Sequence, residues 1–374
     1  MKKTIMFVAS LVIILISLQA LSQEASKTDR WILKPFWKTS IMEGESMFFI
    51  QEKSGELPQS SFLFTPDKIL SIKSATEEIT YTEGKDYVFN PGTKILSLAK
   101  DTKIPFKTKE EMYPPAGAPQ SIKAFRGGNT NLFFSEGRVF HDLQVVVTYT
   151  HTDAWKGYTP NYAGKNLPAA VDKLKNRTPF TLLLYGDSIS RGYNASGVTK
   201  APPFMPSYGD LITLNLEAAY KTKINFVNLS VGGKTSQWGI DSISQVVKEQ
   251  PDLVVIAFGM NDASRTTPAE QFAANVQKMI DEVRKSKPAA EFILIATMTG
   301  NPEWTKASPE LYPQYRDALD KLCTKGVVLA DMTAMWTDLL KQKKFADITG
   351  NGVNHPNDFA HRIYAEVILG LLVK

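Results

Sequence analysis

The sequence predicts a three-layer α/β/α domain with a parallel sheet, preceded by a β-rich, sandwich-like region. In the second half of the chain, continuous apolar runs of strand length alternate with helical stretches, as expected for parallel strands buried on both faces. In the first half, short apolar or alternating runs lie between turns rich in Gly, Pro and Asn, which is typical of an antiparallel sandwich or partial barrel. We place the boundary after residue 159, in a segment rich in turn-forming residues.

Length and composition are those of an ordinary globular protein. The chain has 374 residues, 43% of them hydrophobic and 22% charged, which is enough for two domains and a large core. The formal net charge of +5 is small for this length and shows no basic block, so nucleic-acid binding is not indicated. The single cysteine, Cys323, cannot form an internal disulfide, and the four histidines lack close ligand spacing. We therefore predict no metal and no other cofactor.

The first residues have the pattern of an export signal. Two lysines precede a mostly apolar run over residues 4–18, and the small residues Ala20 and Ser22 follow at the positions that a signal peptidase favours. We predict a signal peptide over residues 1–22 and a periplasmic or extracellular mature protein with no stable membrane insertion. The alternative is a membrane anchor, but the run is short for a span of about 20 residues and no basic stop follows it.

Residues 23–159 form the predicted β-rich region. Its three tryptophans, Trp31, Trp37 and Trp155, either form a sugar-stacking platform or pack in the core. His141 and His151 have no acidic partner at regular spacing and are interpreted as structural or surface residues. Strands are expected over residues 46–50, 61–64, 68–73, 78–82, 87–89, 94–98, 130–134 and 143–149.

Residues 160–374 form the predicted α/β/α domain. Residues 268–285 are expected to form an amphipathic helix, because five apolar residues recur along one stripe. The alternation of strands and helices implies a parallel sheet with right-handed crossovers. Its strands are expected over residues 180–185, 224–229, 253–258, 292–297 and 327–330.

Small and polar residues follow the strands of this predicted sheet. The first strand ends in Gly-Asp-Ser, which contains Ser188, and the second is followed by a glycine-rich turn that contains Gly233. The third is followed by Gly-Met-Asn-Asp, which contains Asn261, and His355-Pro precedes the final helix. The carboxyl ends of parallel strands meet at one sheet edge, where ligands bind. These groups are what acyl transfer needs: a serine nucleophile, a base and oxyanion donors.

In this order, the four blocks resemble those of the SGNH (GDSL-type) hydrolase family and its exported carbohydrate esterases. The resemblance covers the second domain and implies a flavodoxin-like fold in which Ser188 is the nucleophile and His355 the general base. It also implies an oxyanion hole made by the backbone N–H groups of Ser188 and Gly233 and the side-chain amide of Asn261. The Gly-x-Ser-x-Gly elbow of α/β-hydrolases is absent, because Ser190 occupies its last glycine position.

One position departs from the family pattern. The family usually has an aspartate three residues before the histidine, where this chain has Gly352. Either another nearby side chain orients His355, or a backbone carbonyl does so in a Ser–His dyad, or the protein is a non-catalytic carbohydrate-binding relative. Because serine, glycine, asparagine and histidine are all present, we favour the first two; His361 is interpreted as structural. The candidate orienting side chains are Asp347, Asn351, Asn354 and Asp358.

We predict a secreted serine esterase that hydrolyses short-acyl esters, above all O-acetyl esters on carbohydrate, through an acyl-serine intermediate. The export signal, the β-rich region and the family resemblance favour a small-molecule or polysaccharide ester as substrate. Trp238 and Trp304 either line the substrate pocket or pack in the core. The sequence shows no extended amphipathic lid or membrane-binding helix, which disfavours a long-chain lipase. A lipase, lysophospholipase or thioesterase of the same family is the alternative.

Overall fold

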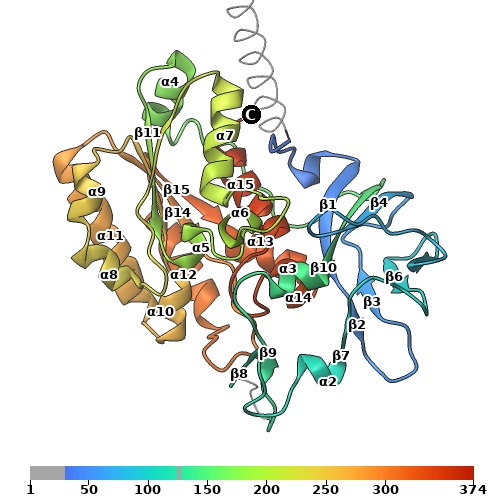
Figure 1. The fold of residues 1–374 in the computed structure, drawn as a ribbon. Coiled ribbons are helices and arrows are strands. Elements are labelled where there is room, and N and C mark those ends of the chain that lie inside the picture. Colours follow the sequence, from blue (N-terminus) through green and yellow to red (C-terminus); the bar gives the residue numbers. More distant parts are fainter. Residues whose placement is uncertain (1–29, 124–127) are drawn as a thin grey trace, which may run out of the picture.

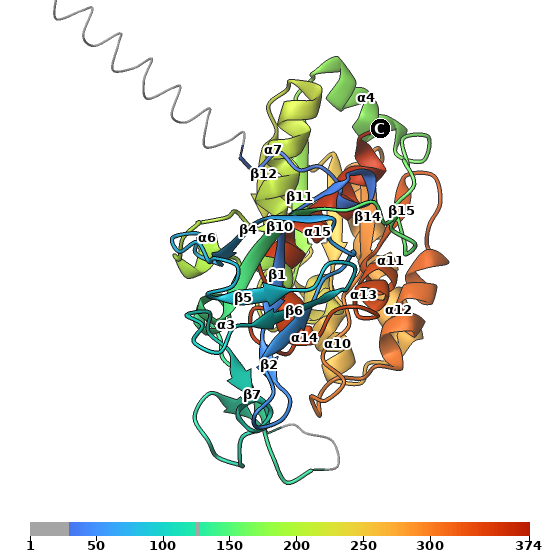
Figure 2. The same cartoon turned by 90° about the vertical axis from the view of Figure 1, so that its right-hand side faces the viewer.

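The computed structural model describes residues 30–123 and 128–374, and the predicted signal peptide lies outside the described residues. In Figure 1 a β-rich region, coloured blue to teal, lies beside an α/β region, coloured green to red. In Figure 2 the β-rich region faces the viewer.

The α/β region contains the predicted parallel sheet. Its order is β12-β11-β13-β14-β15, and every neighbouring pair is parallel. Numbered within the region, this is the order 2-1-3-4-5 of flavodoxin-like folds, so the predicted fold class is confirmed. Each strand lies within one residue of its predicted bounds. The strands are β11 (Thr181–Gly186), β12 (Asn225–Asn228), β13 (Leu253–Ala257), β14 (Glu291–Ala296) and β15 (Val327–Asp331).

Helices cover both faces of this sheet. On one face, α11 (Ala269–Ser286) packs against α8 (Ser236–Asp241), α9 (Ser244–Lys248) and α12 (Leu311–Asp320). On the other face, α7 (Tyr208–Tyr220) packs against α15 (Asp358–Leu372). The apolar stripe predicted for α11 is buried, which confirms that helix. The shorter helices of this region are α4 (Pro168–Asn176), α5 (Ser188–Arg191), α6 (Ser196–Thr199), α10 (Met260–Ser264), α13 (Met332–Leu339) and α14 (Phe345–Ile348).

The β-rich region has two main sheets with short strands. One is antiparallel in the order β1-β10-β4, and the other has the order β5-β6-β3-β2-β7, with β2 and β7 parallel. The predicted strand over 78–82 is reduced to an isolated bridge between Lys73 and Thr80, beside a turn in which Glu77 has φ 61°. The elements are η1 (Phe36–Lys38), β1 (Ile41–Phe48), β2 (Ile50–Gln51), β3 (Gln59–Ser61), β4 (Lys68–Ser74), β5 (Tyr87–Phe89), β6 (Ile95–Leu98), β7 (Lys107–Thr108), α2 (Lys109–Met112), β8 (Ser121–Ile122), β9 (Leu132–Phe133), α3 (Val139–Leu143) and β10 (Gln144–Thr150).

Of the two roles left open for Trp31, Trp37 and Trp155, the structure shows packing against the core. Trp37 and Trp155 each pack edge-on against Phe36, with ring centroids 5.1 Å apart in both pairs. Trp31 is also partly buried against the same core. These residues therefore pack around the start of the β-rich region, where their large apolar rings contribute to burial.

One hydrophobic core runs through both regions. It joins residues of the β-rich sheets, such as Phe62, to residues of the parallel sheet, such as Leu183. A fully buried ion pair also crosses between the regions, with Lys343 Nζ 2.6 Å from Glu45 Oε1. Because breaking such a pair leaves an unpaired buried charge, it holds β1 firmly against the segment that precedes α14.

Helix α14 and the segment that follows it are held against the β-rich strands by further polar contacts. Asp347 accepts hydrogen bonds from the backbone N–H of Phe48 at 2.8 Å and from Ser60 Oγ at 3.0 Å. Asn357 donates to Ser46 Oγ at 2.9 Å. The β-rich region therefore fixes the stretch of chain that carries His355. Within the described residues, no helix has both the length and the hydropathy needed to cross a bilayer.

Candidate active site

Ser188 lies at the sharp turn between β11 and α5. A Cβ on Gly186 would lie 2.4 Å from the carbonyl oxygen of Ala257, so the close approach of the two strands at this point requires glycine. Asp187 caps the helix, because its Oδ1 accepts the backbone N–H of Ile189 at 3.0 Å. The turn therefore places the Ser188 hydroxyl at the carboxyl edge of the sheet.

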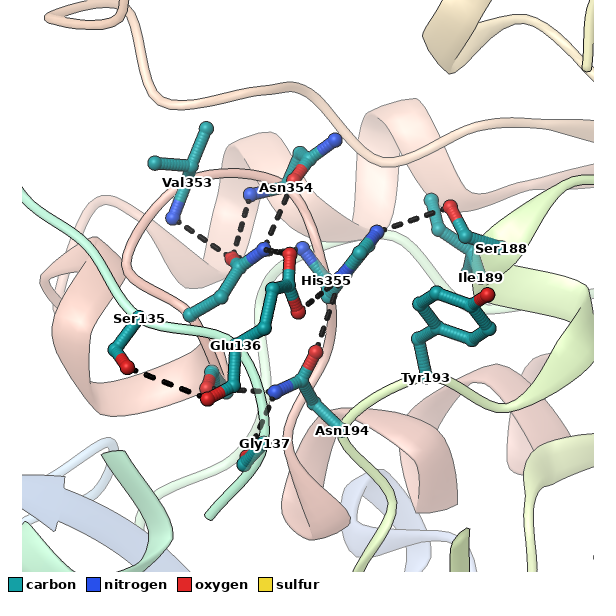
Figure 3. A network of polar contacts seen from close by, with 12 residues as sticks. Ser135, Glu136, Gly137, Ser188, Ile189, Tyr193, Asn194, Val353, Asn354 and His355 are labelled. Carbon is teal, nitrogen blue, oxygen red and sulfur yellow. Dashed lines mark hydrogen bonds and ion pairs between the residues drawn. The ribbon is translucent and has the colours of Figure 1, made fainter. Parts of the chain in front are cut away.

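The structure brings the two predicted catalytic side chains together. Ser188 Oγ lies 2.9 Å from His355 Nε2 (Figure 3), although the two residues are 167 positions apart. Both side chains are buried except for a small exposed face, at 6% relative exposure each. This distance is within direct proton-transfer range, so a neutral imidazole can act here as the base for the hydroxyl.

Asn351 organises the loop that presents His355. Its Oδ1 accepts the backbone N–H groups of Val353 and Asn354 at 3.0 Å and of His355 at 3.1 Å. The carbonyl of His355 accepts the N–H of Gly350 at 2.9 Å. Because one side-chain oxygen accepts three backbone hydrogen bonds, the conformation of the loop is fixed, and with it the position of the imidazole at the sheet edge.

Two acceptors face the other ring nitrogen of His355. Nδ1 lies 3.1 Å from Glu136 Oε2 and 2.9 Å from Asn194 Oδ1. The Asn194 amide donates from Nδ2 to the carbonyl oxygens of Gly137 at 3.0 Å and Gly350 at 2.9 Å. These two bonds leave its Oδ1 facing the ring. The surroundings of His355 thus assign a proton to Nδ1 and leave Nε2 free to accept one.

The four side chains proposed from the sequence to orient His355 make other contacts. Asp347 binds the β-rich strands as described above, and Asp358 accepts the backbone N–H of Ser196 at 2.7 Å. Asn351 holds the loop backbone, and Asn354 accepts from the Asn351 amide at 3.0 Å. Among the described residues, the side chains within hydrogen-bond distance of Nδ1 are Glu136 and Asn194, 219 and 161 positions from His355.

Packing explains why position 352 carries no aspartate. Gly352 has φ +80°, a conformation that L side chains rarely adopt. A Cβ there would lie 2.6 Å from the Phe140 ring and 2.9 Å from the carbonyl oxygen of Phe133. Those two rings stack at 4.8 Å and belong to a small apolar cluster with Phe48. The β-rich region therefore occupies the space that a side chain at 352 would need.

Glu136 is ionised in these surroundings. Burial works to raise the pKa of its carboxyl, but the hydrogen bond and the charge of His355 outweigh it, together with the hydrogen bond from Asn351 Nδ2 at 3.1 Å. The pKa of Glu136 therefore lies below its usual value. A carboxylate thus lies next to Nδ1 at neutral pH.

The predicted oxyanion donors follow the next two strands. Asn261 Nδ2 donates to Asp187 Oδ2 at 3.2 Å and to the carbonyl oxygen of Lys234 at 3.1 Å. Asp262 accepts the backbone N–H of Ser236 at 3.0 and 3.1 Å, which joins the end of β13 to the turn that contains Gly233. Both Asn261 hydrogens are engaged at long hydrogen-bond distances, so donation to an oxyanion requires one of these bonds to be shared.

Asp187 has an unusual protonation equilibrium. Burial raises the pKa of its carboxyl to about 7, and the nearby Asp262 carboxylate acts in the same direction. The hydrogen bonds from Ile189 N–H and Asn261 oppose that rise. A carboxyl with a raised pKa therefore accepts a hydrogen bond from the side chain proposed as an oxyanion donor.

Tyr193 forms a wall beside the nucleophile. Its ring lies edge-on to the His355 ring, with centroids 5.4 Å apart, and the residue is 40% exposed. A Cβ added to Gly232 would lie 2.9 Å from Tyr193 Oη and 3.6 Å from Ser188 Cβ. Gly232 and the tyrosine therefore lie close together on this side of Ser188.

The two tryptophans suggested for a substrate pocket have packing contacts. Trp304 is 8% exposed and belongs to an apolar cluster with Leu132 and Val353. Trp238 is half-buried, with its ring centroid 5.7 Å from that of Tyr185. These contacts are those of core packing.

The other histidines have structural surroundings. Burial lowers the pKa of His361 to about 4, so its ring is neutral. In the described ranges, no group of three or more His, Cys, Asp or Glu side chains is arranged to hold a metal ion. The rings of His141, His151 and His361 contact the backbone carbonyls of Pro202, Asp153 and Tyr193, respectively.

Comparisons with known proteins agree with this geometry. Residues 184–363 match the GDSL-like Lipase/Acylhydrolase family model. The thioesterase 1/protease 1/lysophospholipase L1 of Escherichia coli K12 is 27% identical over 143 residues, 37% of this chain and 63% of that protein. An arylesterase of Vibrio mimicus is 29% identical over 106 residues, 28% of this chain and 49% of that protein. The match therefore spans less than two thirds of the length of these curated relatives.

Two solved structures are similar at low identity. A two-domain esterase active on acetylated mannans is 20% identical with a TM-score of 0.45, covering 57% of this chain and 53% of that one. An acetylxylan esterase from Geobacillus stearothermophilus is 21% identical with a TM-score of 0.42, covering 52% and 94%. The family match spans both Ser188 and His355, and the sheet order agrees with the predicted fold. Residues 184–363 thus belong to the GDSL-like lipase/acylhydrolase (SGNH hydrolase) family.

Proposed function

We propose that this protein is a serine esterase that hydrolyses short-acyl esters, above all O-acetyl esters on carbohydrate, through an acyl-serine intermediate. The observation that carries the proposal is the 2.9 Å distance between Ser188 Oγ and His355 Nε2 at the edge of the parallel sheet. A serine hydroxyl is a weak nucleophile until a base accepts its proton, and this contact supplies the base.

The reaction has two halves at this site. Ser188 Oγ attacks the ester carbonyl carbon while its proton moves to His355 Nε2, and the oxyanion accepts hydrogen bonds from the sheet-edge donors, including Asn261. The bond to the alcohol then breaks, and the proton on Nε2 moves to the departing oxygen. A water molecule repeats the sequence on the acyl-serine, with His355 again as the base, and releases the acid.

The space around Ser188 favours a short acyl group. Tyr193 and Gly232 close one side of the nucleophile, as their close approach indicates. An acetyl group needs little more room than the ester carbon itself, whereas a long chain needs an apolar channel that continues away from the serine. We therefore favour acetyl over long-chain esters.

Two features of the chain support a carbohydrate substrate. The exposed ring of Tyr193 beside His355 offers a flat apolar surface on which a sugar ring can stack. The export signal predicted over residues 1–22 would place the enzyme where polysaccharides occur, in the periplasm or outside the cell. A thioester or lysophospholipid substrate is the second candidate, since the Escherichia coli relative bears those activities in its name.

The esterase proposal is tested with p-nitrophenyl acetate. We expect turnover by the wild-type protein and loss of that turnover in Ser188→Ala, with an unchanged circular dichroism spectrum. Ser264→Ala is a suitable control, because Ser264 follows the same sheet edge and donates to the carbonyl oxygen of Met260. Equal activity of Ser188→Ala and the wild type, or no activity in either, would contradict the proposal.

The substrate class is tested separately. We expect higher kcat/KM for p-nitrophenyl acetate than for the octanoate, and acetate release from a panel of acetylated polysaccharides. A preference for octanoate, or for palmitoyl-CoA or lysophosphatidylcholine over all acetylated glycans, would favour the second candidate. Amino-terminal sequencing of the exported protein tests the signal peptide, for which we expect residue 23 at the start.

A further inference from the structure

The acceptors around His355 come from two different parts of the chain. Asn194 lies in the α/β region between α5 and α6, whereas Glu136 lies in the β-rich region between β9 and α3. Only Glu136 carries a negative charge, and its Oε2 lies 3.1 Å from Nδ1. The two acceptors can therefore make different contributions, one by geometry alone and one by charge.

We propose that Glu136 is the positioning carboxylate of a Ser188–His355–Glu136 triad, and that the β-rich region supplies it to a site otherwise built by the α/β region. The inference rests on the proposed function. When His355 accepts the Ser188 proton, the ring carries a positive charge, which the Glu136 carboxylate stabilises through Nδ1–H. Asn194 holds the same tautomer without adding charge.

Packing determines the position of Glu136. The stacked rings of Phe133 and Phe140 lie on either side of it in the sequence and pack with Phe48 and Ala346. Its second oxygen, Oε1, accepts from the Asn351 amide at 3.1 Å. The packing of the two phenylalanines and the hydrogen bond of Glu136 thus hold the segment, so the carboxylate is in place before the reaction begins.

The glycine at 352 completes this arrangement. Because the Phe140 ring and the Phe133 carbonyl occupy the space next to Gly352, no side chain from that position can reach the imidazole. The same two phenylalanines that exclude a side chain at 352 flank Glu136. The packing of these phenylalanines therefore excludes a carboxylate at position 352 and also places the Glu136 carboxylate beside His355.

The charged role of Glu136 is tested with Glu136→Gln, which keeps the size and polarity of the side chain. We expect kcat for p-nitrophenyl acetate to fall roughly 10- to 100-fold, less than in a triad with a single acceptor because Asn194 still holds the ring. KM should change little, since the carboxylate acts on the imidazolium and not on bound ester. Asp142→Asn is the matched control, because Asp142 lies on nearby α3 and pairs with Arg138.

Chemical rescue and a spectroscopic signal complete the test. In Glu136→Ala, formate should restore part of kcat by occupying the vacated carboxylate position. The wild-type protein should show a downfield Nδ1–H proton resonance that moves upfield in Glu136→Gln, a readout independent of turnover. If the wild type is active and Glu136→Gln keeps its full kcat and an unmoved Nδ1–H resonance, the inference is overturned. Absence of wild-type activity would instead contradict the proposed function.

Discussion

The sheet edge and the β-rich region hold their active-site groups by different means. At the sheet edge, Ser188 directly follows a strand, so the backbone ladder determines where its hydroxyl lies. In the β-rich region, Glu136 lies in an irregular stretch between β9 and α3, held by stacked phenylalanines. The nucleophile therefore depends on local chain geometry, and the outer partner of the base depends on the contact between two regions.

The largest expected effect is at the residue where the two regions meet. His355→Ala should lower kcat by about 10⁴- to 10⁶-fold, because neither Ser188 nor Glu136 can act without the imidazole. Adding Glu136→Gln to that variant should cause no further loss, since the carboxylate acts only through the ring. A double variant clearly less active than His355→Ala would show that Glu136 acts by another route.

The next effect tests the contact between the regions. Lys343→Met leaves the buried Glu45 carboxylate without its positively charged partner, and should lower the free energy of unfolding by about 3–5 kcal/mol. Chemical denaturation measures this loss. Lys341→Met is the control, because its pair with Asp338 lies at the surface and should contribute less than about 1 kcal/mol. Equal stability of the two variants would mean that the buried pair does not hold the regions together.

A smaller effect is confined to the sheet edge. Asn261→Ala should lower kcat by about 10²- to 10³-fold, as expected for loss of one oxyanion donor. Asn225→Ala, at the exposed start of β12, is the control and should retain full activity. If Asn261→Ala raised KM and left kcat unchanged, the side chain would bind ground-state substrate rather than the oxyanion.

The smallest expected effect is a pH dependence of the free energy of unfolding, caused by a residue at the contact between η1 and α15. Burial raises the pKa of Glu366 to about 7, and its Oε2 accepts the backbone N–H of Phe36 at 3.3 Å. Between about pH 4.5 and 7 the folded protein keeps this proton while the unfolded chain loses it, so the free energy of unfolding falls as pH rises, by at most about 1.4 kcal/mol per pH unit.

Glu366→Gln removes the titrating carboxyl at this position. The variant should therefore lose less stability than the wild type between about pH 4.5 and 7.5, a difference of about 1–3 kcal/mol measured by urea denaturation at both values. Glu282→Gln, on an exposed pair with Lys285, should follow the wild type. Parallel curves for the wild type and Glu366→Gln would mean that Glu366 is ionised in the folded protein.

The sheet-edge groups could be predicted from the sequence because the position of a residue after a parallel strand determines its place in the fold. Ser188 follows a continuous apolar run, and Asn261 follows another. Gly352 could be recognised as a departure from the family pattern, but the reason for it could not. That reason is the Phe140 ring, which reaches position 352 only through the packing of the two regions.

Glu136 and Asn194 could not be predicted, since neither lies in a periodic segment or near His355 in the sequence. The sequence also leaves Trp304 open between a substrate pocket and the core, and its ring packs with Leu132 of the β-rich region. The signal peptide and the domain boundary after residue 159 stay predictions. The shared core does show that the two regions fold around a common interior.

The distance of 219 positions between Glu136 and His355 has a consequence for folding. Contacts between distant parts of a chain form slowly, because the intervening segment must lose conformational freedom before the contact contributes any stability. The carboxylate contact can form only after both regions are folded and docked. During refolding from urea, full ester turnover should therefore return later than the far-ultraviolet circular dichroism signal, and enzymatic activity would measure completion of the tertiary structure.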